Sequence, residues 1–140
     1  AMPILYGSSN LMYKIYCDGA SRSNPGEASI GVSVTKEGNE IEFISKKIGI
    51  ATINVAEYKS LRAALIHCVE NKITDACIFL DSLLVVQQVN EKIKVRSDNL
   101  KALNTQCKDL MSQINNLEII HVRREKNKRA DELANIALDS

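Results

Sequence analysis

The amino-acid sequence predicts a single α/β domain in which one mixed β-sheet is flanked by helices. The N-terminal third contains runs of alternating apolar and polar residues, whereas helical patterns and short apolar runs alternate in the rest of the chain. The order β-β-β-α-β-α-α-β-α combines a hairpin meander with crossovers that return to the sheet. A length of 140 residues, 45% hydrophobic and 25% charged, is typical of one domain with a real core.

The first part of the chain predicts an antiparallel meander. Residues 11–18, "LMYKIYCD", alternate in polarity and form the first predicted strand. Residues 28–49 contain two further alternating runs on either side of Glu37-Gly38-Asn39, which is a hairpin signal. Residues 1–10 show no period, and we assign them to an N-terminal extension or to residues introduced by cloning. The predicted domain therefore covers residues 11–140.

The later elements alternate between helices and buried strands. From Asn54 to Val69 the apolar residues recur with a helical period. Residues 75–81, "DACIFLD", are almost wholly apolar, as expected of a strand buried on both faces. The remaining predicted elements are a helix or helical turn at 82–92, a longer helix at 99–115, a strand at 117–122 and a last helix at 128–138.

Composition limits the class of protein. No apolar run approaches the roughly 20 residues that a membrane-spanning helix needs, and no signal peptide is evident, so we expect a cytoplasmic protein without membrane contact. The four cysteines stand singly among apolar residues and indicate core positions rather than ligands or disulfides. The net charge of +1 predicts no polyanionic partner by itself. Cations concentrate in His121–Arg129, "HVRREKNKR", which could bind phosphates or form a solvated loop.

Four carboxylates lie at the ends of predicted elements, and each has an ordinary local explanation. Asp18 could start a turn, and Glu57 has capping-box spacing after Asn54. Asp81, or the serine after it, could cap the next helix, and Asp131 could complement the dipole of the last helix. Each residue taken alone therefore leaves a structural role open.

Taken together, the carboxylates favour a metal site. The strands that precede Asp18 and Asp81 should be parallel neighbours, and sites in such sheets form beyond the carboxyl ends of the strands. Four carboxylates converging there without a cation would repel one another and raise one another's pKa. Oxygen ligands without a His or Cys cluster favour Mg²⁺ or Mn²⁺ over zinc or copper.

Four blocks, "YCDGASRSNPG", "NVAEYKSL", "LDSLLVVQQV" and "REKNKRADELAN", closely resemble the type-1 ribonuclease H family in order and spacing across about residues 12–138. The resemblance implies a five-stranded mixed sheet ordered 3-2-1-4-5. It also implies an endonuclease that hydrolyses the RNA strand of RNA/DNA hybrids and leaves 5′-phosphate and 3′-hydroxyl ends. Two Mg²⁺ ions, or Mn²⁺ as a substitute, would assist the reaction. The family's acidic residues map onto Asp18, Glu57, Asp81 and Asp131, with Asp18 bridging the ions and Asp131 holding the water-activating one.

The same resemblance suggests contacts to the hybrid, bound by a monomeric protein. Asn24, Asn54, Glu57 and the main chain near Gly19 and Ala20 are candidates for sensing the 2′-hydroxyl that distinguishes RNA from DNA. Thr52 matches the family's phosphate-pocket threonine on the DNA strand. The full set of predicted substrate contacts is Gly19, Ala20, Ser21, Asn24, Thr52, Asn54, Arg123, Arg124 and Asn127.

The chain departs from the family pattern in three places. Ile53 stands where the family usually has a polar residue that contacts the hybrid. Many members carry a catalytic histidine on a flexible loop, whereas His121 falls within the last predicted strand and is interpreted as structural. The segment "NEKIKVRS" leaves no room for the protruding basic helix of some bacterial members, so that its cations, Lys92, Lys94 and Arg96, would bind the hybrid weakly.

Competing interpretations remain at this point. One is a non-catalytic nucleic-acid-binding module on the same fold, although a phosphate binder gains nothing from four bare carboxylates. Another is a related exonuclease or strand-transfer enzyme, which the first two blocks disfavour. A domain excised from a reverse-transcriptase polyprotein, and a structural domain whose acids are all caps, complete the alternatives.

Overall fold

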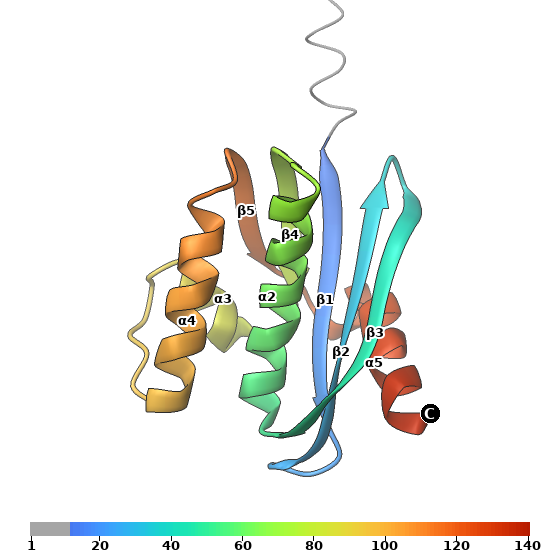
Figure 1. Cartoon of the computed structure of the whole chain (residues 1–140), viewed down its shortest axis with the longest axis vertical. Helices are drawn as coiled ribbons and strands as arrows, with labels where there is room; N and C mark the ends of the chain where they lie inside the picture. The colour runs from blue at the N-terminus through green and yellow to red at the C-terminus, as the bar shows by residue number, and fades with distance from the viewer. Residues whose placement is uncertain (1–11) are drawn as a thin grey trace, which may run out of the picture.

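The computed structural model describes residues 12–140, which form one five-stranded sheet with helices on both faces (Figure 1). The predicted extension at residues 1–10 lies outside the described residues. The strands are β1 (Tyr13–Ser21), β2 (Gly26–Lys36), β3 (Asn39–Ala51), β4 (Asp75–Leu80) and β5 (Asn116–His121). The helices are α2 (Ile53–Glu70), α3 (Leu83–Val89), α4 (Asp98–Met111), a 3-10 turn (Arg124–Lys126) and α5 (Lys128–Asp139).

The strand order β3-β2-β1-β4-β5 confirms the predicted sheet. The first three strands pair antiparallel, and β4 pairs parallel with both β1 and β5. Glu37 and Gly38 connect β2 to β3 with φ of 53° and 80°, the left-handed pair that tight hairpins need. The hairpin signal at Glu37-Gly38-Asn39 is therefore confirmed.

One face of the sheet packs on α2 and carries the main core. Alternate residues of β1 and β2 point toward this helix, so their apolar side chains meet its apolar stripe. Tyr58 lies at the centre: its hydroxyl donates to Gln88 Oε1 at 2.7 Å and accepts from Asn104 Nδ2 at 3.1 Å. These bonds join α2 to α3 and α4 and leave the buried hydroxyl fully paired.

The opposite face of the sheet packs closely against α5 (Figure 1). On this face β2 presents the small residues Ser29, Gly31 and Ser33. A Cβ at Gly31 would lie 2.6 Å from the amide nitrogen of Ala134, and Ser29 Oγ donates to the Ala134 carbonyl at 2.6 Å. Because Gly31 pairs with Asp18 across the β1–β2 ladder, the start of α5 is brought next to Asp18.

Several predicted boundaries were wrong by a few residues. The helix predicted at 99–115 ends at Met111, because the amides of Gln113 and Ile114 bond to carbonyls three residues earlier and tighten the last turn. The helix predicted at 82–92 ends at Val89, and Glu91 adopts φ of 62°. Residues 90–97 form no helix, so this segment holds no protruding basic helix, but the predicted helix was three residues too long.

Three of the four cysteines occupy core positions, as expected, and Cys77 does not. Cys17, Cys68 and Cys107 are buried, Cys77 is half-buried, and all four are free thiols. Within residues 12–140, none of the helices has the length and apolar character needed to cross a bilayer.

Candidate active site

Three carboxylates from separate elements converge at one edge of the sheet. Asp18 lies in β1, Asp81 directly follows β4, and Glu57 stands in the second turn of α2. One carboxylate oxygen from each residue lies within 4.8 Å of the other two. Asp18 and Glu57 are only 6% and 5% exposed, and Asp81 is half-buried. Parallel pairing of β1 with β4 explains the meeting, because both strands end at the same edge.

Glu57 faces Asp18 because it does not cap its helix. The N-cap of α2 is Thr52, whose hydroxyl accepts from the Val55 amide at 3.2 Å, so the capping-box interpretation of Asn54 and Glu57 is wrong. Glu57 Oε1 instead accepts from the Gly19 amide at 2.5 Å. A Cβ at Gly19 would lie 2.6 Å from the Ala56 carbonyl oxygen, so only glycine permits this approach.

The N-cap of α3 is Ser82 and not Asp81. Ser82 accepts from the Val85 amide at 3.3 Å and caps the helix. Asp81, one residue earlier, is thereby left for the carboxylate cluster.

The cluster is electrostatically strained without a cation. Burial raises the pKa of Asp18 to about 8, with further contributions from the charge of Asp81 and from a hydrogen bond and the charge of Asp131. Burial also raises the pKa of Glu57 well above its usual range, followed by the charges of Asp18 and Asp81. Bound divalent cations would favour the ionised forms, and an all-oxygen donor set suits hard ions such as Mg²⁺ or Mn²⁺. The residues present therefore fit a divalent metal.

Asp131 lies at the margin of this cluster. It is half-buried in the first turn of α5 and is not among the three carboxylates that share the 4.8 Å radius. Asp131 contributes to the raised pKa of Asp18, after burial and the charge of Asp81.

The polar residues around the start of α2 form the exposed rim of the site. Asn24 Oδ1 accepts from the Ile53 amide at 3.0 Å and fastens the loop after β1 to the helix N-terminus. Asn24 and Asn54 are exposed, and the Ile53 side chain is 43% exposed. Thr52 is half-buried and uses its hydroxyl as the helix cap.

The other predicted contacts in β1 are less accessible. Gly19 is buried with its amide bonded to Glu57, and Ala20 is half-buried. Ser21 Oγ donates to the Ala51 carbonyl at 2.9 Å. These residues shape the floor of the site.

The basic segment after β5 is partly neutralised. Arg123 and Arg124 are exposed, and Arg123 pairs with Glu125 at 2.9 Å. Arg129 is held by Glu40 at 2.9 Å and by Glu132 at 2.6 Å. His121 is exposed and ends β5, so it stands in the strand as predicted.

Asn127, also predicted to contact substrate, is 1% exposed and lies behind the carboxylates. Sequence reasoning missed this placement, and it also missed the role of Gly31 in seating α5. The alternation of small residues at Ser29, Gly31 and Ser33 was the available signal for the second point.

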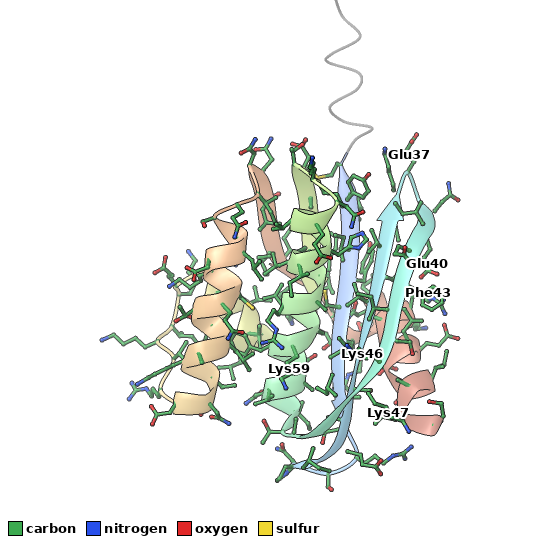
Figure 2. All side chains as sticks on the ribbon, in the orientation of Figure 1. Glu37, Glu40, Phe43, Lys46, Lys47 and Lys59 are labelled. Atoms are coloured by element: carbon green, nitrogen blue, oxygen red, sulfur yellow. The ribbon has the colours of Figure 1, made fainter. Side chains whose placement is uncertain are left out.

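Cations line several hollows, and two of these hollows include residues of α2. A cleft of about 600 Å³ lies beside the site and is lined by Asn54, Leu84, Gln88, Ile93, Lys94, Arg96, Ser97 and Leu100. A groove of about 460 Å³ between β3 and α2 includes Lys46 and Lys59 among its lining residues (Figure 2). The first hollow shares Asn54 with the rim of the carboxylate site.

Comparisons with known proteins agree with this geometry. The family model described as reverse transcriptase-like matches residues 16–137. A bifunctional protein of Mycobacterium tuberculosis is 41% identical over 128 residues, which cover 90% of this chain and 35% of the relative. The ribonuclease HI of Halobacterium salinarum is 38% identical over 125 residues, which cover 89% of this chain and 63% of the relative. The chain thus spans between a third and two thirds of these relatives.

A solved structure extends the comparison. The LC11 ribonuclease H1, isolated from compost by a metagenomic approach and crystallised in complex with an RNA/DNA hybrid, superposes with a TM-score of 0.85. It is 41% identical, and the match covers 91% of this chain and 96% of that one. With the matching strand order, the extent of the family match and this similarity, the chain belongs to the type-1 ribonuclease H family.

Proposed function

We propose that this protein is a metal-dependent endonuclease that hydrolyses the RNA strand of RNA/DNA hybrids and leaves 5′-phosphate and 3′-hydroxyl ends. The observation that carries the proposal is the convergence of Asp18, Glu57 and Asp81 within 4.8 Å, two of them buried. Buried acids with raised pKa values destabilise a fold at neutral pH, and groups of such acids are typical of functional sites. A relative with 41% identity is known in complex with an RNA/DNA hybrid, which supports this class of substrate.

The metal would be Mg²⁺, with Mn²⁺ as a substitute, held by Asp18, Glu57 and Asp81 and flanked by Asp131. When bound, two such cations would supply an activated water and neutralise charge on the leaving 3′-oxygen. The chain contributes the rigidity of the site, because the Gly19 amide holds the Glu57 carboxylate and the paired strand β1 holds Asp18.

Strand choice would depend on the exposed rim. Asn24 and Asn54 lie at the N-terminus of α2, where their amide groups could donate to or accept from a 2′-hydroxyl. Ile53 beside them offers only an apolar contact, so we expect fewer hydrogen bonds to the hybrid here than in relatives with a polar residue.

The neighbouring cleft would hold the backbone of the DNA strand. Its cations, Lys94 and Arg96, are both exposed, and Ser97 adds a hydroxyl. Contacts of this kind are sequence-independent and weaken with salt. We therefore expect modest, salt-sensitive affinity for the hybrid. A monomer acting in the cytoplasm stays a prediction.

The test is incubation with a labelled RNA/DNA hybrid, duplex RNA or duplex DNA in Mg²⁺, Mn²⁺ or chelator. We expect cleavage of the RNA strand of the hybrid alone, only with metal, and products that carry a 5′-phosphate. Asp18→Asn serves as the inactive control. Hybrid binding without cleavage under every metal condition would instead support the non-catalytic module.

A further inference from the structure

Asn127 stands at the N-terminus of α5 but does not cap the helix with its side chain. An asparagine at this position normally turns its side-chain oxygen toward the first helical amides. Here the side chain makes no cap bond and is 1% exposed, turned into the protein. Its amide group therefore serves a different part of the structure.

The side-chain nitrogen of Asn127 bridges β1 and the residue that follows β4. Nδ2 donates to the Cys17 carbonyl at 2.8 Å and reaches Asp81 Oδ2 at 3.4 Å. The β1–β4 ladder has its last pair at Cys17 and Leu80, so this amide lies where the two strands cease to pair. It thus joins the residue before Asp18 to the carboxylate of Asp81.

The side-chain oxygen of Asn127 shows that the donor is the group in use. Oδ1 is buried and has no hydrogen-bond partner among the described residues 12–140. An unpaired buried acceptor destabilises a fold, so the bonds donated by Nδ2 account for the orientation of this side chain. An aspartate of the same shape would set a carboxylate oxygen against the Cys17 carbonyl and Asp81.

The main chain of Asn127 is hydrogen-bonded to that of Asp131, the fourth acid. Its carbonyl accepts from the Asp131 amide at 3.2 Å and closes the first turn of α5. One residue therefore contacts the strand that bears Asp18, the side chain of Asp81 and the helical turn that bears Asp131.

We propose that Asn127 is a positioning residue that holds Asp18, Asp81 and Asp131 in the mutual arrangement that binds metal, an inference that rests on the function proposed above. It does so without contacting substrate, so the earlier assignment of Asn127 as a substrate contact is replaced. Partners of this kind typically change metal affinity or activity by about 10- to 100-fold when they are removed.

The experiment compares Asn127→Asp and Asn127→Ala with the wild-type chain. Calorimetric titration of the substrate-free protein with Mg²⁺ or Mn²⁺ measures metal affinity, and single-turnover cleavage and hybrid binding in chelator are measured separately. We expect metal affinity and cleavage rate each to fall by about 10- to 100-fold, while hybrid binding in chelator changes less than about twofold. The Asp variant should lose more than the Ala variant, because its carboxylate repels Asp81.

A matched control separates positioning from general loss of stability. Asn104 is also buried, and it donates one side-chain bond to Tyr58 on the core face. Asn104→Ala should lower the unfolding midpoint as Asn127→Ala does, yet keep wild-type metal affinity. Equal metal affinities in the wild type and both Asn127 variants would overturn the proposal.

Two further outcomes are distinguishable. If the wild type binds metal but cleaves no hybrid, the proposed function fails, while the metal titrations still decide the role of Asn127. If neither variant folds, NMR of the wild type decides: the Asn127 side-chain NH₂ resonances should exchange slowly and shift on adding Mg²⁺. Resonances that do not move with metal would refute positioning.

Discussion

Replacing Asp18 with asparagine should abolish cleavage and yet stabilise the metal-free protein. Asp18 is buried, and its pKa is raised from 3.8 to about 8 by burial and by the neighbouring acids. Asparagine keeps the shape of the side chain and cannot ionise in either the folded or the unfolded state. The expected combination of lost activity and gained stability distinguishes a functional acid from a structural turn residue.

The magnitude follows from linkage between protonation and folding. One pKa unit corresponds to about 1.4 kcal/mol, and about three units separate the unfolded pKa from pH 7, so the cost at pH 7 is at most about 4 kcal/mol. Some of that cost stays in the variant, because Glu57 keeps a raised pKa from burial. We expect Asp18→Asn to raise the free energy of unfolding by about 1–3 kcal/mol at pH 7.

The stability gained by Asp18→Asn should increase as pH rises from about 4 to about 8. Because the folded pKa of Asp18 is raised, the native state binds more protons than the unfolded state between about pH 4 and pH 8. Wild-type stability in chelator therefore falls as pH rises through this window, and the variant should fall less steeply. Well below the unfolded pKa of 3.8, where the carboxyl is neutral in both states, the stability difference between the two proteins should stop changing with pH.

The assay is urea unfolding in chelator at several pH values, repeated with Mg²⁺. Asp98→Asn is the control, because the Asp98 side chain is 98% exposed and lies outside the cluster. Mg²⁺ should stabilise the wild type more than Asp18→Asn. An Asp18→Asn protein that is less stable than wild type at every pH would refute the reasoning and identify Asp18 as structural.

Three further predictions concern the scaffold and the substrate. Gly31→Ala should destabilise the fold by about 1–3 kcal/mol in urea, because the added methyl group meets the Ala134 backbone; unchanged stability would mean that α5 can shift freely. Thr52→Ala should cost about 1 kcal/mol by removing the cap bond to Val55, and Thr52→Ser should restore it. Arg96→Ala should weaken hybrid binding and reduce the slope of log affinity against log salt by about 0.9, as measured by fluorescence anisotropy; an unchanged slope would exclude a phosphate contact.

Much of the fold could be predicted from the sequence, because its signals are local. The period of two in β2, the left-handed turn at Glu37 and Gly38, and the apolar run of β4 each arise within a few residues. The helix ends were less accurate, because the last turn of α4 depends on the burial of Ile114 against the core.

The chemistry of the site was predictable only in part. Asp18, Glu57, Asp81 and Asp131 were identified as a set, and the structure brings the first three together, with Asp131 outside their cluster. The local explanation of Glu57 as a capping residue was wrong, because Thr52 begins the helix two residues earlier than Asn54. The direction of a side chain at a helix start depends on which residue caps the helix, and Thr52 was considered from sequence only as a phosphate contact.

The sequence by itself determined the order of the elements and the acids at their ends, since periodicity and turn chemistry act over a few neighbouring residues. Only the tertiary structure decided which groups hold those acids. The Gly19 amide meets Glu57 across 38 residues, and the Asn127 amide meets the Cys17 carbonyl across 110. Contacts over such separations arise from the pairing of β1 with β4 and the close packing of α5 on Gly31, which no local pattern specifies.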